Sequence, residues 1–203
     1  MIAIVDYGVG NLFSLKSSFA AIGADAVVTR DAAVLRSAER ILLPGVGAFG
    51  DAADKLRQSG LDSVMFEQAR AGKPLLGICV GMQLLFDRGL EYGEHAGLGL
   101  VPGEVRFIGE VIPAGLKIPQ IGWNALRFVR RDCPLFRYIK EGDYVYFVHS
   151  YAGFDCAEYT AATVEYGAEL TAAVQRDNIL GTQFHPEKSG PIGLNILRAF
   201  CEW

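Results

Sequence analysis

The segment that most constrains the fold is residues 74–81, Pro-Leu-Leu-Gly-Ile-Cys-Val-Gly, which leads into the apolar, helix-like run 82–86. An apolar strand that passes through two glycines into a helix is typical of a nucleophile elbow, here with Cys79 at the turn. The glycines allow a sharp turn that exposes Cys79 at the carboxyl end of the strand. A helix N-terminus favours thiolate, and the Val80 amide is placed to donate to an oxyanion. These residues alone leave two interpretations open, a nucleophile and a buried structural cysteine.

A second reactive group follows another apolar run near the end of the chain, residues 179–184. His185 precedes Pro186, and a residue before proline adopts an extended conformation, so His185 is expected to continue this strand. Glu187, two positions later, should project from the same side as the imidazole. A thiol nucleophile needs an imidazole within reach and a carboxylate that orients the imidazole. Cys79, His185 and Glu187 are therefore the candidate catalytic residues.

The order of apolar runs predicts an α/β fold. In the first half of the chain they alternate with amphipathic stretches, which is the pattern of β-α-β units in a parallel sheet. The second half has six β-like runs and a closing helix, which indicates antiparallel additions to the core sheet. We expect one domain over residues 1–203, with an open, mostly parallel central sheet flanked by helices and extended by antiparallel strands. The expected strands are 2–5, 26–29, 41–43, 75–78, 105–108, 125–129, 144–148, 160–164, 170–174 and 179–184, and the expected helices are 12–22, 52–56, 63–71 and about 192–202.

Composition disfavours several classes of protein. The chain has 19 basic and 23 acidic residues and a net charge of −4, so neither a nucleic acid nor an anionic membrane is an expected partner. No apolar run reaches ~18 residues and the chain begins with a strand, so we expect no membrane span or signal peptide and a cytoplasmic location. The four cysteines form no C-x-x-C pair, which argues against a zinc site and a disulfide framework. Gly8-Val9-Gly10 lacks the third glycine of a dinucleotide fingerprint, so we do not expect a bound nucleotide.

The reactive segments resemble a known family. Residues 77–83, Gly-Ile-Cys-Val-Gly-Met-Gln, together with His185-Pro186-Glu187 resemble the class I, triad-type glutamine amidotransferases. These enzymes hydrolyse the side-chain amide of glutamine and deliver ammonia to a partner synthase. Further segments look like those of the glutaminase subunits of imidazole glycerol phosphate synthase, an enzyme of histidine biosynthesis, and this resemblance covers the whole chain. Those segments are residues 6–11, 43–49, 117–124 and 148–151. Val80 departs from the leucine of many relatives, but only its backbone concerns the oxyanion.

The resemblance assigns roles to residues around the triad. It implies flavodoxin-like layering, and it places the oxyanion hole in the glycine-rich loop at Val46 and Gly47, which would complement Val80. Glycines in this loop would also let a peptide rotate towards the developing charge. The implied substrate-binding residues are Gln83, Ser150 and Tyr151.

The resemblance also implies the partner. A (β/α)₈-barrel cyclase subunit would cover the site in a heterodimer and receive the ammonia, with no metal or organic cofactor. The candidate interface residues, expected in loops that flank the site, are Asn11, Trp123 and Lys188.

Alternatives remain open at this point. A class I glutaminase of another biosynthetic pathway would share the triad but is not expected to carry Ile121-Gly122-Trp123-Asn124. A stand-alone γ-glutamyl hydrolase would turn over without a partner. A non-catalytic binding module would not need an intact Cys79, His185 and Glu187.

Overall fold

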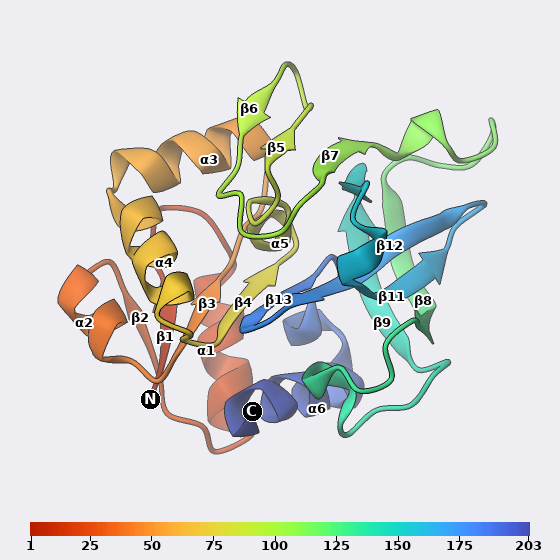
Figure 1. Ribbon diagram of the computed structural model, residues 1–203. Coiled ribbons are helices and arrows are strands. Elements are labelled where there is room, and N and C mark those ends of the chain that lie inside the picture. The colour runs from red at the N-terminus through yellow and green to blue at the C-terminus, as the bar shows by residue number, and fades with distance from the viewer.

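The computed structural model describes residues 1–203 and is built on a nine-stranded sheet in the order β2-β1-β3-β4-β13-β12-β11-β8-β9 (Figure 1). The first five strands in this order are parallel, and the other four each run antiparallel to the strand before them. The predicted parallel sheet with antiparallel additions is therefore confirmed. Its strands are β1 (Ile2–Val5), β2 (Ala26–Thr29), β3 (Arg40–Leu43), β4 (Leu75–Ile78), β8 (Gln120–Phe128), β9 (Tyr144–His149), β11 (Thr160–Glu165), β12 (Glu169–Arg176) and β13 (Ile179–Thr182).

A second sheet of four short strands, in the order β10-β7-β5-β6, lies beside the central sheet and was not expected from the sequence. Its β5 and β6 have two residues each, too few to show an alternation of apolar and polar side chains. This sheet places the loop between β5 and β6 beside the N-terminal end of α3 (Figure 1). Its strands are β5 (Arg88–Gly89), β6 (His95–Ala96), β7 (Glu104–Phe107) and β10 (Tyr151–Phe154).

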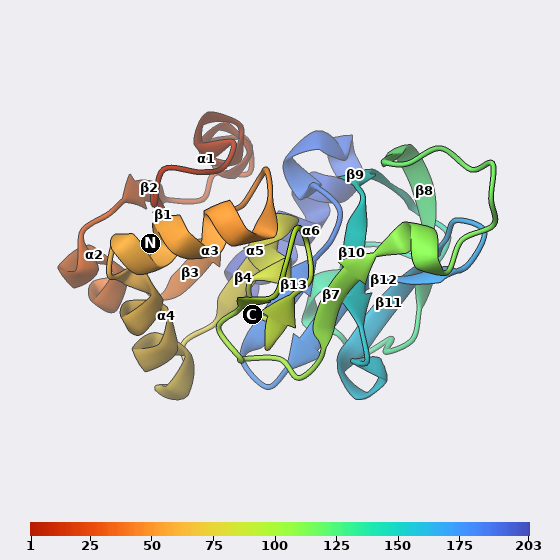
Figure 2. The same cartoon turned by 90° about the horizontal axis from the view of Figure 1, so that it is seen from above.

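Helices cover both faces of the parallel half of the central sheet. In the view from above, α1 and α6 lie on one face, and α3 and α4 lie on the other (Figure 2). None of the helices is long and apolar enough to cross a membrane. The α-helices are α1 (Leu12–Ala21), α2 (Ala32–Ser37), α3 (Phe49–Gln58), α4 (Leu61–Arg70), α5 (Val80–Gln83) and α6 (Gly190–Glu202), and the 3-10 turns are η1 (Ile108–Glu110), η2 (Pro134–Phe136), η3 (Ala157–Tyr159) and η4 (Pro186–Lys188).

Strands β1, β4 and β13 are buried along their whole length, and β4 and β13 lie side by side near the centre of the sheet. Every residue in both is buried, because strands of a parallel sheet are covered on both faces by helices or loops. They pair in parallel with Gly77 opposite Gly181, and they belong to one cluster of 55 buried apolar residues. The carboxyl ends of β1, β3, β4 and β13 therefore lie at one edge, where the loops that follow them converge.

Several expected boundaries are wrong. The helix expected over 52–56 is α3, which begins at Phe49 and ends at Gln58, and the helix expected over 63–71 begins at Leu61. The run at 105–108 forms β7 of the second sheet and not an addition to the central sheet. Strand β8 begins at Gln120 rather than at 125, because backbone pairing with β9, from Gln120 opposite His149 onward, overrides the irregular apolar pattern. Trp123 therefore lies on a strand and not in a loop. Strand β13 ends at Thr182, two residues early, and the helix after Cys79 is the single turn α5 rather than a helix through residue 86.

Candidate active site

Cys79 occupies a strained turn between β4 and α5. Its backbone has φ 55° and ψ −115°, a region that residues with a side chain rarely adopt. The turn needs the neighbouring glycines, because a Cβ on Gly81 would lie 2.0 Å from the Leu43 carbonyl oxygen. The Cys79 amide donates to the Thr182 carbonyl oxygen at 2.7 Å, which ties the elbow to β13. The predicted nucleophile elbow is therefore present in its geometry, although only one helical turn follows it.

His185 and Glu187 form a buried pair. The Nδ1 atom of His185 lies 2.8 Å from Oε1 of Glu187, and both side chains are almost fully buried. Since a carboxylate only accepts, Nδ1 carries the proton and Nε2 remains for Cys79. Burial lowers the pKa of His185, but hydrogen bonds to Cys79 and Glu187 and their charges outweigh burial and raise this pKa to about 10. At neutral pH this raised pKa favours the imidazolium form of His185.

The backbone of His185 is fixed from two sides, although the residue lies beyond the end of β13. Its conformation is extended, as expected for a residue before proline, with φ −101° and ψ 99°. Its amide donates to the Tyr146 carbonyl oxygen at 2.9 Å. Its carbonyl oxygen accepts from the Ser189 hydroxyl at 2.7 Å. We expected a continuing strand to position His185. Instead, strand β9 and the residue before α6 hold its backbone in place.

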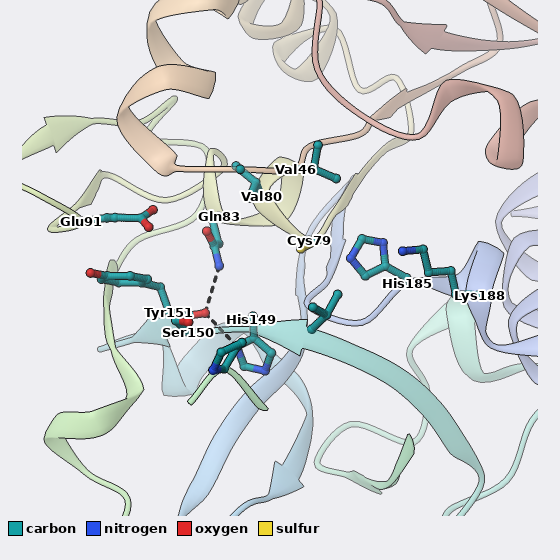
Figure 3. Close-up of a pocket in the computed structure, with 13 residues that line it drawn as sticks. Val46, Cys79, Val80, Gln83, Glu91, His149, Ser150, Tyr151, His185 and Lys188 are labelled. Atoms are coloured by element: carbon teal, nitrogen blue, oxygen red, sulfur yellow. Dashed lines mark hydrogen bonds between the residues drawn. The ribbon is translucent and has the colours of Figure 1, made fainter. Parts of the chain in front are cut away.

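A cavity of about 300 Å³ opens at Cys79 and gathers most of the predicted site residues (Figure 3). Glu187 is not in its wall because it lies behind His185, and Asn11 and Trp123 lie outside the wall. Sequence reasoning missed Glu91, Pro119, Val148 and His149. The predicted residues in the wall are Val46, Gly47, Cys79, Val80, Gln83, Ser150, Tyr151, His185 and Lys188.

The glycine-rich loop after β3 has one fixed part and one part that faces the cavity. The Tyr7 hydroxyl donates to the Pro44 carbonyl oxygen at 2.7 Å. Gly45 packs so closely on the elbow that a Cβ there would lie 2.4 Å from the Gly81 nitrogen. Val46 and Gly47 line the cavity, and Gly47 has φ +88°, which favours glycine. The loop is thus anchored at its start and placed beside Cys79 at its end.

Gln83 and Glu91 supply polar atoms to the cavity wall. Gln83 uses its amide hydrogens on the Tyr151 carbonyl oxygen, at 3.0 Å, and on Oε1 of Gln183, at 3.1 Å. Its own Oε1 therefore remains as an acceptor. The Glu91 carboxylate accepts from the Phe49 amide at 2.7 Å. No local pattern marks Glu91, because it reaches the site on the loop between the two-residue strands β5 and β6.

The three interface candidates have different surroundings. Trp123 is 60 % exposed, and its ring meets the ring of Tyr146 edge-on with centroids 4.9 Å apart. The Lys188 ammonium lies 5.6 Å from the centroid of the same Tyr146 ring. Asn11 instead caps α1, where its side chain accepts from the Ser14 amide at 3.3 Å. Tyr146 thus joins Trp123 and Lys188 into one exposed cluster at the mouth of the cavity.

Two solved structures share the fold of this chain. A crystal structure described as a glutamine amidotransferase superposes with a TM-score of 0.77 at 19 % identity, covering 100 % of this chain and 98 % of that one. A chain of the PurLQS structure from Thermotoga maritima superposes with a TM-score of 0.75 at 21 % identity, covering 99 % and 97 %.

Sequence comparisons define the family more narrowly. The family model described as glutamine amidotransferase class-I matches residues 3–202. The imidazole glycerol phosphate synthase subunit HisH of Wolinella succinogenes is 46 % identical over 204 residues, covering 100 % of this chain and 99 % of that protein. The subunit of the same name from Geobacter sulfurreducens is 48 % identical, covering 99 % and 98 %. The chain therefore belongs to the class I glutamine amidotransferase family and, within it, to the HisH subunits of imidazole glycerol phosphate synthase.

Proposed function

We propose that the whole chain acts as one glutaminase domain, which hydrolyses glutamine and supplies ammonia to a cyclase subunit in histidine biosynthesis. The observation that carries this proposal is the buried arrangement of Cys79, His185 and Glu187 at the wall of a cavity of about 300 Å³. A cysteine at a strained elbow, beside an imidazole oriented by a carboxylate, is the arrangement for covalent attack on an amide.

The first half of the reaction is attack and release of ammonia. The Cys79 thiolate adds to the side-chain amide carbon of glutamine and forms a C–S bond. The Val80 amide and an amide of the Val46–Gly47 segment would donate to the oxyanion. When the C–N bond breaks, the His185 imidazolium gives its Nε2 proton to the leaving ammonia. The product is a γ-glutamyl thioester on Cys79.

The second half is hydrolysis of the thioester. Neutral His185 takes a proton from water, whose oxygen attacks the thioester carbon. The C–S bond breaks, glutamate leaves, and the thiolate forms again beside a protonated imidazole. Glu187 holds Nδ1 of His185 through both halves, so Nε2 faces the reacting atoms each time.

The other end of glutamine meets the polar wall of the cavity. The α-ammonium group would donate to the Glu91 carboxylate and to Oε1 of Gln83, both of which face the cavity (Figure 3). Ser150 precedes strand β10 and Tyr151 begins it. Both would contact the α-carboxylate of glutamine. This arrangement selects an amino acid over a simple amide, because only an amino acid carries the ammonium group that the Glu91 carboxylate would bind.

The surface around the cavity suits a partner that encloses the ammonia. Ammonia released into water would be protonated and would lose its nucleophilicity, so an acceptor must cover the exit. The cluster of Trp123, Tyr146 and Lys188 lies at the cavity mouth and presents aromatic area, in which protein interfaces are enriched. The HisH relatives are named as synthase subunits, which supports a separate partner chain. We infer that this partner is a (β/α)₈-barrel cyclase.

The decisive experiment compares two nitrogen sources. The chain and its cyclase partner are assayed for product with glutamine and with ammonium salt. Cys79→Ala should abolish the glutamine-dependent reaction and leave the ammonium-dependent reaction at the wild-type rate, because only the thiol is lost. Cys201→Ala, at a partly buried cysteine outside the cavity, serves as the control and should keep both activities. Loss of both reactions in Cys79→Ala, or full glutamine-dependent synthesis, would contradict the proposal.

A further inference from the structure

Gln183 places a buried amide against the nucleophile and has no role in the mechanism described so far. The residue is fully buried, two positions before His185. Its Nε2 atom lies 3.8 Å from the Cys79 sulfur, within range for a hydrogen bond to sulfur. Its backbone is fixed separately, because its amide donates to the Ala172 carbonyl oxygen at 2.8 Å. Only the backbone of Gln183 takes part in this bond to β12, and its side-chain amide points to Cys79.

The hydrogen-bond partners of Gln183 decide which end of its amide faces the sulfur. The Tyr151 carbonyl oxygen can only accept, so Gln83 must present its NH₂ group there. The other hydrogen of that NH₂ group points to Gln183, which must then present its own oxygen, 3.1 Å away. The NH₂ group of Gln183 is left to face Cys79. The Tyr151 carbonyl oxygen, which can only accept, thus sets the orientation of the side-chain amides of both Gln83 and Gln183.

A buried histidine, His149, also donates to the Tyr151 carbonyl oxygen, from which this series of hydrogen bonds begins. Nδ1 of His149 lies 2.8 Å from the same Tyr151 carbonyl oxygen and donates to it. Burial lowers the pKa of His149 to about 4, with a further lowering by the charge of His185, so the ring is neutral at neutral pH. The Tyr151 carbonyl thus accepts from both His149 and Gln83, which fixes its position on both sides.

We propose that Gln183 is a catalytic residue whose side-chain amide donates a hydrogen bond to the Cys79 sulfur and stabilises the thiolate, while Gln83 holds that amide in its donating orientation. The inference rests on the proposed glutaminase function, in which the thiolate is first the nucleophile and later the leaving group. His185 stabilises the thiolate only while it is protonated. Gln183 is neutral and donates in every protonation state of His185, so it supports the sulfur after the imidazole has given up its proton.

The other groups near the sulfur do not replace this donor. Among titratable groups, His185 bonds to Cys79 and Tyr7 has an electrostatic interaction with it, while Glu187 and His149 interact with His185. The Tyr7 hydroxyl donates its hydrogen to Pro44. Because Cys79 is only 5 % exposed, water contributes little to stabilising its charge. A fixed amide donor therefore acts on the sulfur with little competition from water.

The test measures the reactivity of Cys79 in the full chain without its partner. The rate of Cys79 alkylation by iodoacetamide is followed by peptide mass spectrometry from pH 5 to pH 10. Gln183→Met keeps the size of the side chain and removes the donor. We expect alkylation about tenfold slower at neutral pH, from the lower end of the range for hydrogen bonds to charged groups. At high pH, where the thiolate forms without help, the variant should match or exceed the wild type, since a less stabilised thiolate is more nucleophilic.

Control variants separate this role from a structural one. Gln68→Met changes another buried glutamine, in α4, and should leave the alkylation profile unchanged. Gln83→Met should slow alkylation at neutral pH by a smaller factor, because Gln183 is then free to turn its oxygen to the sulfur. This variant also tests the proposal if Gln183→Met does not fold. Wild-type profiles in both Gln183→Met and Gln83→Met, or an equal loss of rate at every pH, would overturn it.

Turnover gives a second measurement. In the complex with the cyclase, Gln183→Met should lower kcat for glutamine about tenfold and leave KM within about twofold, because the donor acts on the sulfur rather than on bound substrate. A raised KM with unchanged kcat would contradict the role. If the wild type released no glutamate but the alkylation profiles shifted as expected, the proposed function would fail while the action of Gln183 on the sulfur would stand.

Discussion

The Tyr7 hydroxyl donates a 2.7 Å hydrogen bond to the carbonyl oxygen of Pro44, and this bond joins the segment after β1 to the glycine-rich loop after β3. Tyr7 is buried, and burial raises its pKa, so the hydroxyl keeps its proton and remains a donor. The bond lies one residue before Gly45 and two before Val46, which lines the cavity. The loop is therefore anchored at Pro44, just before the residues that line the cavity.

Tyr7→Phe should lower the free energy of unfolding by about 1–2 kcal/mol, because it leaves the buried Pro44 carbonyl without its donor. Urea denaturation measures this change. Tyr144→Phe is the matched control, since Tyr144 is 60 % exposed, and it should stay within about 0.5 kcal/mol of the wild type. Equal stability of Tyr7→Phe and the wild type would show that the hydroxyl does not hold the loop.

Glu187→Gln should remove a contribution to stability that depends on pH. Burial lowers the pKa of His185, but Cys79 and Glu187 outweigh it and raise this pKa to about 10, against 6.5 as its ordinary value. A raised pKa stabilises the folded state fully below pH 6.5, and this contribution is lost as pH rises to about 10. The difference in unfolding free energy between wild type and variant should therefore shrink from pH 6.5 to pH 10.

The same variant should turn over more slowly than the wild type but remain above Cys79→Ala, because the imidazole keeps a hydrogen-bond partner and loses only the charge beside it. Pre-steady-state formation of the thioester measures this. The role given to Glu187 would be wrong if the variant were as inactive as Cys79→Ala, or if the stability difference stayed constant across the pH window.

Acid should destabilise the fold through His149. Burial lowers its pKa to about 4, so the ring stays neutral in the folded state while the unfolded chain binds a proton below about pH 6.5. The unfolded state then binds more protons between these values, and stability falls by up to about 3 kcal/mol as pH drops from 6.5 to 4. His149→Gln should show a shallower loss in urea titrations over this range. Parallel curves for wild type and variant would argue against a neutral buried ring.

Trp123→Ala should weaken binding of the cyclase subunit by about tenfold or more, since exposed aromatic residues at the centre of an interface contribute most to affinity. Isothermal titration calorimetry measures the change. Val129→Ala is the control, because Val129 is 55 % exposed just beyond the other end of β8 and should leave affinity unchanged. Unchanged affinity in Trp123→Ala would place the partner elsewhere on the surface.

Local sequence determined the parts of the site that depend on neighbours in the chain. Gly77 and Gly81 around Cys79 allow the sharp elbow, and a Cβ on Gly77 would lie 2.6 Å from the carbonyl oxygen of Gly81. Pro186 fixes the extended conformation of His185, which brings Glu187 next to the imidazole. The runs of β4 and β13, which contain no charged residue, mark the centre of a parallel sheet. These features need only two or three adjacent residues.

The tertiary structure alone decided which residues distant in the sequence lie near the site of Cys79. Glu91 arrives on a loop between strands too short to leave a pattern, and Gln183 faces the sulfur only because Gln83 and Tyr151 fix its amide. Trp123 lies on β8 because pairing with β9 extends that strand beyond its apolar core. Each of these contacts joins residues far apart in the chain. Their geometry is set by strand order and hydrogen-bond register, which no local pattern of side chains encodes.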